Sequence, residues 1–263
     1  MKLEEIAKKM CANGKGILAA DESTGTMDKR LKSVNVECTE KNRLFFRQTL
    51  FNSDAMKNYI GGVILFDETI RQKTSLGITI PELILKNQAI PGIKVDKGAK
   101  PLAGSLGETI TEGLDGLRER LKEYYDLGAR FTKWRAVYNI GDKHPSIKSI
   151  KSNAHALARY AAMVQEAKMV PIIEPEVLMD GSHDIDKCYQ VTTDVLNECY
   201  NELAIHNVDL KGTVLKPNMI VPGSKCSIKV SSKEIAIKTL ECLKKKFQVK
   251  FLVLHFYLVD NQK

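Results

Sequence analysis

Short apolar segments rich in β-branched residues recur along the chain, and each is followed by a segment with helical spacing. The expected strands are Ile17–Ala20, Gly62–Phe66, Ile93–Val95, Arg130–Trp134, Val170–Ile173, Thr213–Lys216 and Phe251–Phe256. Strands that alternate with helices indicate βαβ units, which build a parallel sheet covered by helices. The alternation therefore restricts the chain to the α/β class, either as a closed (β/α)8 barrel or as an open doubly wound sheet.

The segments between these strands carry recognisable helix signals. Leu114 to Leu127 has apolar residues at helical spacing and stops before Gly128, a residue type that commonly follows a helix. A second apolar stripe runs from Asn153 to Lys168. Ser231-x-x-Glu234 is a capping box that predicts the start of another helix. The apolar residues that this helix is expected to bury are Ile235, Leu240, Leu243 and Phe247.

Charged side chains fall on or after the carboxyl ends of the first six expected strands. They are Asp21, Glu68, Lys94, Asp96, Lys133, Arg135, Glu174, Glu176 and Lys216. A (β/α)8 barrel builds its site from the carboxyl ends of many strands, so this pattern favours the barrel. An open dinucleotide-binding sheet would place paired glycines after the first strand, and Leu18–Gly25 lacks them. The seven strands occupy the 263 residues, which predicts one domain, 1–263, with a TIM barrel truncated to about seven strands.

The composition of the chain and the distribution of its charges indicate which kinds of partner to expect. The formal net charge is +8, but the lysines are spread over helix faces without interleaved aromatic residues, so an anionic metabolite is expected rather than nucleic acid. The six cysteines and five histidines are dispersed without ligand spacing, which predicts neither a disulfide framework nor a metal site. We find no signal-peptide core and no apolar stretch of about 18 residues, so we expect a cytoplasmic protein without a membrane partner.

Lys216 is an unusual residue in its segment, because it ends an apolar strand and precedes Pro217. Lysine is almost never fully buried unless its charge is compensated. A side chain that extends its amine to solvent is one interpretation. The other is a desolvated amine with a lowered pKa, which would be a nucleophile toward carbonyl groups.

The other strand-end residues match what such an amine requires. Attack on a ketone gives a protonated imine, which lets a neighbouring carbon–carbon bond break without a cofactor. The steps need a carboxyl group to move protons, a base for the neighbouring hydroxyl and a nearby cation that keeps the lysine unprotonated. Glu174, Glu176, Asp21 and Lys133 supply these group types. The two glutamates lie two residues apart on an extended segment, so both are expected to face the same side.

Six segments of the chain resemble the class I fructose-bisphosphate aldolases. They are Gly14–Gly25, Gly61–Phe66, Gly92–Gly98, Lys133–Arg135, Pro171–Glu176 and Leu215–Met219. The resemblance runs in the family's order from about Gly14 to about Leu252. It implies a cytosolic lyase of glycolysis and gluconeogenesis, usually a homotetramer with a (β/α)8 barrel and no cofactor. The implied reaction cleaves fructose 1,6-bisphosphate to dihydroxyacetone phosphate and glyceraldehyde 3-phosphate.

The resemblance also implies roles for individual residues. Lys216 would form the Schiff base, Glu174 would transfer protons during imine formation, and Asp21 would act at the C4 hydroxyl. Lys133 would be the neighbouring cation and Glu176 its hydrogen-bonding support. The residues implied to hold the substrate and its phosphates are Thr26, Arg30, Arg43, Lys94 and Arg135. Thr26 stands where the family more often has serine, and its hydroxyl keeps the contact.

The chain departs from the family after Leu252, where the family continues with a phosphate-binding loop, Ser-Gly-Gly-Gln-Ser, and a last strand. Residues 253–263 read differently and the sequence stops. We therefore expect impaired cleavage of the bisphosphate, together with exposed sheet edges that favour association. Two alternatives are a catalytically silent interaction protein, for which a cytoskeletal partner is a family-level possibility, and an aldolase for a smaller phosphorylated sugar.

Overall fold

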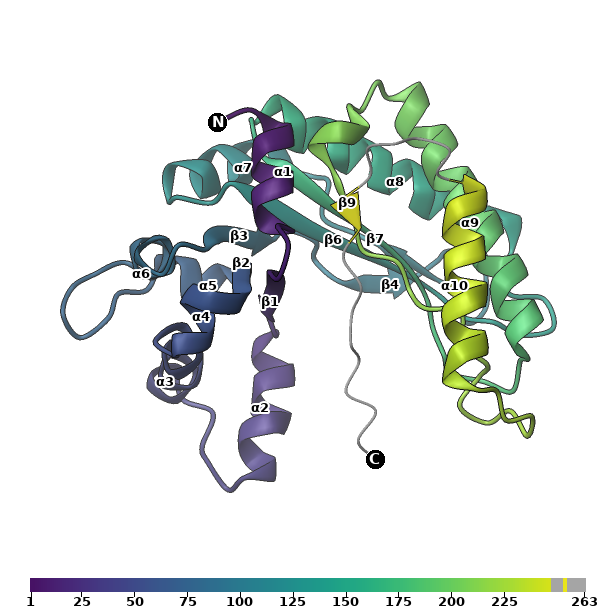
Figure 1. Ribbon diagram of the computed structural model, residues 1–263, viewed down its shortest axis with the longest axis horizontal. Helices are drawn as coiled ribbons and strands as arrows, with labels where there is room; N and C mark the ends of the chain where they lie inside the picture. The colour runs from purple at the N-terminus through teal and green to yellow at the C-terminus, as the bar shows by residue number, and fades with distance from the viewer. Residues whose placement is uncertain (247–252, 255–263) are drawn as a thin grey trace.

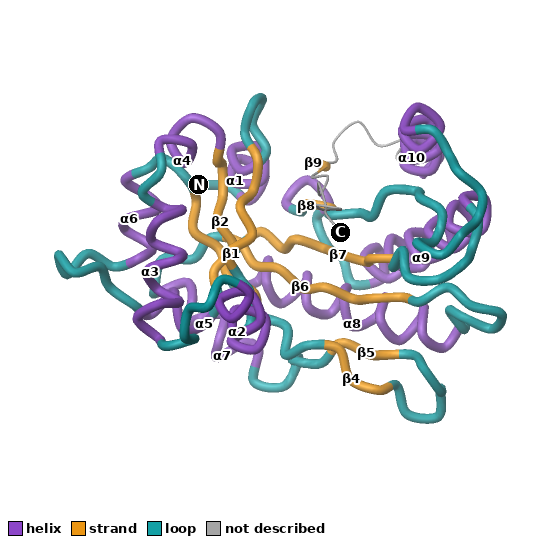
Figure 2. The backbone as a smooth tube through the Cα atoms, turned by 90° about the horizontal axis from the view of Figure 1, so that it is seen from below, coloured by secondary structure: helices purple, strands orange, loops and turns teal. Residues whose placement is uncertain are grey.

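A curved parallel sheet forms the centre of the computed structural model, which describes residues 1–246 and 253–254, with side chains up to residue 244 (Figures 1 and 2). Its strand order is β1-β2-β3-β6-β7-β8-β9. The strands are β1 (Gly16–Ala20), β2 (Ile60–Leu65), β3 (Ile90–Lys94), β6 (Phe131–Tyr138), β7 (Val170–Val177), β8 (Val214–Leu215) and β9 (Val253–Leu254). All neighbouring pairs are parallel. Within the described residues β1 and β9 are the two edges, so the predicted truncated barrel is confirmed as an open arc.

The predicted strands all overlap observed strands, with two differences in extent. β6 and β7 continue to Tyr138 and Val177, so Arg135, Glu174 and Glu176 lie within strands rather than after them. Only Val253–Leu254 of the last predicted strand is described, and the rest of that prediction lies outside the described residues. A separate antiparallel pair, β4 (Ala99–Pro101) with β5 (Thr109–Thr111), follows β3.

Helices cover the outer face of the sheet, with α3 to α6 beside β1–β3 and α7 to α9 behind β6 and β7 (Figures 1 and 2). The helices are α1 (Leu3–Met10), α2 (Thr24–Ser33), α3 (Glu40–Phe51), α4 (Asp54–Tyr59), α5 (Asp67–Arg71), α6 (Ile80–Lys86), α7 (Leu117–Asp126), α8 (Ile147–Glu166), α9 (Ile185–Ile205) and α10 (Ser232–Lys246), with a 3-10 turn at Leu210–Gly212. Among the described helices, none is both long and apolar enough to cross a membrane.

The helix signals in the sequence correspond to observed ends. Gly128 follows α7 with a φ of +110°, a conformation that glycine adopts without strain. Ser231 Oγ accepts a hydrogen bond of 3.2 Å from the Glu234 backbone N–H at the start of α10. Leu243 is buried as predicted, but Leu240 is 48% exposed, because it falls outside the stripe that packs against α9. Phe247 lies outside the described residues.

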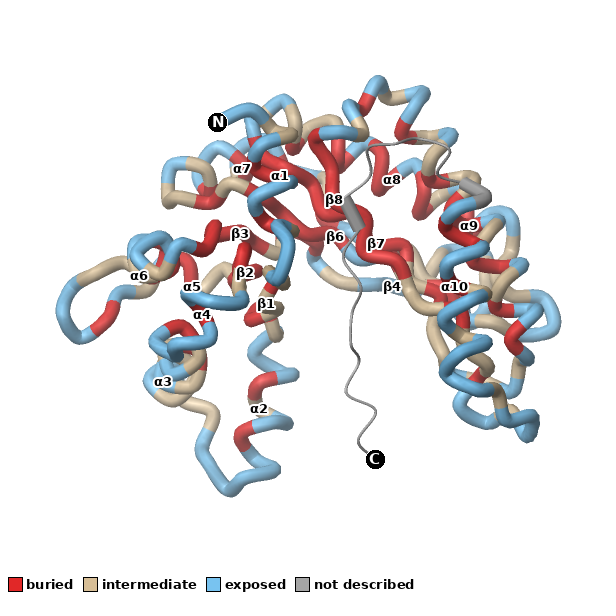
Figure 3. Tube along the Cα trace, viewed as in Figure 1, coloured by how far each residue is buried: buried red, intermediate tan, exposed pale blue. Residues whose placement is uncertain are grey.

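The strands bury both of their faces, because alternate side chains point to opposite sides of a sheet. The larger apolar cluster lies between the sheet and the outer helices, and it includes Leu157, Ala161 and Val164 of the predicted α8 stripe. A smaller cluster joins Ile6, Ala7 and Met10 of α1 to residues of the strands, among them Phe131 and Ile172 near the amino ends of β6 and β7. Figure 3 shows that the strands of the sheet are mostly buried. The carboxyl ends of the strands are thereby left for polar groups.

Gly61 fixes how closely α1 approaches the sheet. A Cβ atom at this position would lie 2.2 Å from the Met10 carbonyl oxygen and 2.8 Å from its carbon, and neither atom belongs to a flexible side chain. We expect Gly61→Ala to lower the free energy of unfolding by about 2–3 kcal/mol in a urea titration. Gly25→Ala is the control, since its Cβ meets nothing within 4 Å and replacing a helical glycine should be neutral or mildly stabilising. Equal stabilities of the two variants would contradict this prediction.

Candidate active site

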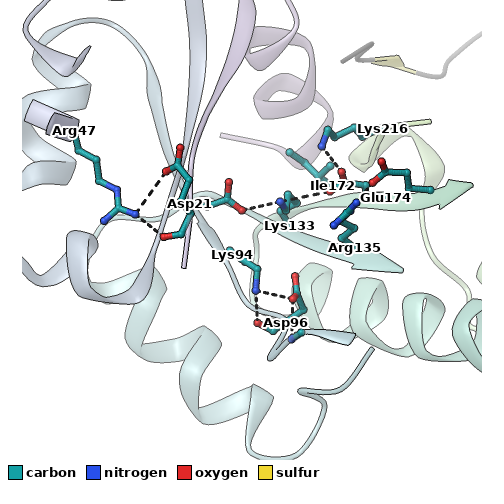
Figure 4. A network of polar contacts seen from close by, with 12 residues as sticks. Asp21, Arg47, Lys94, Asp96, Lys133, Arg135, Ile172, Glu174 and Lys216 are labelled. Carbon is teal, nitrogen blue, oxygen red and sulfur yellow. Dashed lines mark hydrogen bonds and ion pairs between the residues drawn. The ribbon is translucent and has the colours of Figure 1, made fainter. Parts of the chain in front are cut away.

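Four buried charged side chains meet at the carboxyl ends of the strands: Lys216, Glu174, Lys133 and Asp21, here called the ionic quartet (Figure 4). The Lys216 amine donates a hydrogen bond to Glu174 Oε1. Glu174 Oε2 lies 3.6 Å from Lys133 Nζ, and Lys133 Nζ lies 2.7 Å from Asp21 Oδ2. Amines and carboxylates therefore alternate along one connected line, contributed by the carboxyl-end regions of four different strands.

Lys216 is positioned by the end of β8. Its backbone N–H donates a 2.9 Å hydrogen bond to the Ile173 carbonyl of β7, and Pro217 then ends the strand pairing. The residue is 6% exposed. Burial lowers the pKa of the Lys216 amine, and the Lys133 cation lowers it further, while Glu174 acts in the opposite direction. The net result is a pKa below the usual lysine value, which increases the neutral, nucleophilic fraction of the amine.

Lys133 is the third residue of β6, and the pKa of its amine is displaced in the opposite direction. Burial alone would lower the pKa of its amine, but the carboxylates of Glu174 and Asp21 outweigh burial and raise it above the usual lysine value. Lys133 therefore stays a cation over the physiological pH range. Two buried lysines joined through Glu174 thus have pKa values displaced in opposite directions.

Glu174 and Glu176 both face the cavity that contains Lys216, as their spacing predicted. The support expected of Glu176 is different, however. Glu176 accepts a hydrogen bond from Arg135 Nε and is not paired with Lys133. The carboxylates that contact Lys133 are those of Glu174 and Asp21.

Two cavities share Lys133 and Arg135 and so flank the ionic quartet. The first, of about 340 Å³, contains Lys216, Glu174 and Glu176. The second, of about 740 Å³, contains Asp21. Volumes of this order are typical of small-molecule sites.

The residues predicted to hold phosphate divide between two environments. Thr26, Arg30, Lys94 and Arg135 line the larger cavity. Arg43 lines neither cavity, because its guanidinium is paired with Glu68 and donates a 2.8 Å hydrogen bond to the Cys38 carbonyl.

The fold also supplies site residues that sequence reasoning missed. Arg47 is 1% exposed and donates to the Glu22 carbonyl oxygen at 2.6 Å and to Thr69 Oγ1 at 2.8 Å, which fixes the segment beside Asp21 (Figure 4). An arginine on a helix usually indicates a solvated face, so the sequence carried no signal for this role. Lys97 lines the larger cavity as a further cation. Lys97 closely follows the third predicted strand, and this position could have identified it as a site residue.

The chain is similar to known proteins of one family. A family model described as class-I fructose-bisphosphate aldolase matches residues 2–256. A probable class 1 fructose-bisphosphate aldolase of Xylella fastidiosa is 55% identical over 242 residues, which are 92% of this chain and 72% of that protein. The cytosolic fructose-bisphosphate aldolase 4 of Arabidopsis thaliana is 54% identical over 232 residues, or 88% of this chain and 59% of that protein.

A solved structure shows the same fold. Fructose-bisphosphate aldolase of Plasmodium falciparum, crystallised with TRAP and a small-molecule inhibitor, superposes with a TM-score of 0.93 at 42% sequence identity. The match covers 96% of this chain and 74% of that one. On the matched family model, the sequence identity and the shared fold, the chain belongs to the class I fructose-bisphosphate aldolase family.

Proposed function

We propose that this chain cleaves fructose 1,6-bisphosphate to dihydroxyacetone phosphate and glyceraldehyde 3-phosphate through a Schiff base on Lys216. The observation that carries the proposal is the ionic quartet, in which a buried amine with a lowered pKa contacts a carboxylate and has a permanent cation nearby. Family membership supports the same reaction, because the relatives are named for this substrate.

Three members of the quartet take part in the bond changes, and the fourth, Lys133, is the cation that helps to keep the pKa of Lys216 low. The neutral Lys216 amine adds to the C2 ketone, and one proton moves from the nitrogen to the former carbonyl oxygen to give a carbinolamine. Glu174 takes up a proton from solvent and passes it to the departing hydroxyl, so that water leaves and an iminium ion remains. Asp21 accepts the C4 hydroxyl proton, the C3–C4 bond breaks, and its electron pair moves to the iminium to give an enamine. Protonation of the enamine and hydrolysis of the resulting imine release the second product and restore the amine.

The larger cavity is the proposed location of a substrate phosphate. Thr26, Arg30, Lys94 and Arg135 bring cationic or hydroxyl groups to its wall, and guanidinium groups bind phosphate through paired N–H donors. Arg43 is assigned a supporting role through Glu68, in the segment next to this cavity.

The cellular location of the chain, its oligomeric state and its protein partners are also proposals. We assign the chain to the cytoplasm, as the name of the Arabidopsis relative states for that protein. A homotetramer and a cytoskeletal partner follow the family resemblance, and sedimentation and co-pelleting experiments test them. A silent interaction protein is the alternative that the comparisons do not favour.

Trapping the imine tests the proposed function directly. The chain is incubated with dihydroxyacetone phosphate and reduced with borohydride, and the modified residue is located by mass spectrometry. We expect one adduct, on Lys216. Folded protein that gives no adduct would instead support the silent interaction protein.

Glu174→Gln separates proton transfer from nucleophilicity. Loss of this carboxylate removes a group that raises the pKa of Lys216, so the neutral amine fraction should increase. We nevertheless expect imine formation to slow by about 10²–10⁴-fold, because the proton donor for dehydration is gone. The measurement is the rate of adduct formation, with circular dichroism confirming the fold. A rate at or above that of the unmodified chain would exclude the role given to Glu174.

A further inference from the structure

A cluster of metal-ligating side chains lies where α8 packs against α9, outside both cavities of the active site. It consists of His155 on α8, Glu202 in the last turn of α9 and His206 at the end of that helix. The spacing of the histidines in the sequence predicted no metal site. The fold nevertheless brings two of them to one carboxylate, since His155 and Glu202 are 47 positions apart.

The distances in this cluster suit a single small cation. Glu202 Oε2 lies 3.0 Å from His155 Nδ1 and 3.5 Å from His206 Nδ1. One candidate ligand atom from each residue lies within 4.8 Å of the other two. Ligand atoms around a tetrahedral Zn²⁺ with bonds of about 2.0–2.2 Å are roughly 3.3 Å apart, so small side-chain adjustments would close the site.

The surroundings favour positive charge at this position. Glu202 and His206 lie at the carboxyl end of a 21-residue helix, where the aligned peptide dipoles present partial negative charge. His206 Nδ1 also lies 2.9 Å from the Glu202 carbonyl oxygen, and the hydrogen bond between them would be lost when that nitrogen binds the metal. The salt-bridge partners of Glu202 among the described side chains are these two histidines, so a cation would not need to displace a lysine or an arginine.

We propose that His155, Glu202 and His206 bind one divalent transition-metal ion, with Zn²⁺ as the best fit. Imidazole nitrogen with carboxylate oxygen suits Zn²⁺, whereas Mg²⁺ and Ca²⁺ favour oxygen ligands alone. Three protein ligands leave a fourth position for water. The cluster lines neither of the two cavities at the active site, so the ion fastens α8 to α9 rather than contacting substrate. This site is independent of the aldolase chemistry.

Calorimetric titration of the metal-free full chain with Zn²⁺ tests the site, after alkylation of the accessible thiols. We expect one Zn²⁺ per chain and at least tenfold weaker binding in each of His155→Gln, Glu202→Gln and His206→Gln. Zn²⁺ should raise the melting temperature of the unmodified chain but not that of these three variants. Co²⁺ should give a d–d spectrum without a thiolate charge-transfer band. His155 is 51% exposed at its side chain, so His155→Gln should leave the metal-free melting temperature unchanged.

His144→Gln is the matched control, because His144 Nδ1 also lies beside a glutamate, 3.5 Å from Glu108 Oε1, but without a second histidine. It should bind Zn²⁺ like the unmodified chain. The proposal is overturned if Zn²⁺ does not bind below millimolar concentration, or if the three cluster variants bind as tightly as the control. Imine trapping on Lys216 is measured separately. Its failure would contradict the proposed function and would leave the metal site unaffected.

Discussion

Lys216→Arg is expected to abolish covalent capture of dihydroxyacetone phosphate. Arginine keeps a cation beside Glu174, but its guanidinium stays protonated and cannot add to a ketone. The expected loss in the rate of adduct formation is roughly 10⁴-fold or more, because without the amine no covalent intermediate forms. The measurement is borohydride trapping followed by peptide mass spectrometry. If the unmodified chain cleaves fructose 1,6-bisphosphate at a measurable rate, Lys216→Arg should lower that rate by a similar factor.

The control for this variant is Lys244→Arg, which changes an exposed lysine on α10 outside the quartet. Its adduct should form at the unmodified rate and on Lys216. An adduct on another lysine in Lys216→Arg, formed at a comparable rate, would show that the nucleophile has been wrongly assigned. Circular dichroism and melting temperature confirm that both variants are folded.

Lys133→Met is expected to move the pH profile of imine formation to higher pH. The Lys133 cation helps to lower the pKa of Lys216, so removing it lets that pKa rise. A smaller fraction of the Lys216 amine is then neutral at pH 7, and each unit of pKa costs about tenfold in that fraction. We expect the trapping rate at pH 7 to fall by at least about tenfold and to recover partly above pH 9. The measurement is the initial rate of adduct formation across pH.

Lys133→Arg distinguishes electrostatics from packing. It keeps a cation near Glu174 and Asp21, so the pH profile should stay close to that of the unmodified chain even if the rate falls. If the trapping rate of Lys133→Met falls equally at every pH and the profile does not shift, the electrostatic role is contradicted. Lys133 would then act through packing. Asp21 is 2.7 Å from the Lys133 amine, so both variants need a check of thermal stability.

The sequence predicted the arc of strands because each strand carries its own local signal. It could not predict which charges pair, since that depends on strand register. Lys133 is opposite Ile172 and Arg135 is opposite Glu174 across β6 and β7. Each cation contacts the carboxylate two residues beyond its register partner, so Lys133 meets Glu174 and Arg135 meets Glu176. The family resemblance implied that Glu176 supports Lys133, whereas in the structure Glu176 pairs with Arg135.

Other gaps in the prediction have similar physical causes. The burial of Arg47 depends on Glu22 and Thr69, which belong to separate segments of the chain. The pairing of His155 with His206 depends on how two helices align along their length. Local periodicity carries no information on contacts of this kind, whereas it does identify the helices that make them.

Because positive and negative groups alternate in the quartet, its net charge changes between the stages of one catalytic cycle. With a neutral Lys216 amine, two carboxylates face one lysine cation, and the buried group carries an excess negative charge. Formation of the iminium ion adds one positive charge next to Glu174 and brings the count to zero. In a poorly solvated interior the balanced arrangement is favoured. When the Lys216 amine is neutral, the quartet is thus one cation short, and formation of the iminium ion supplies that charge.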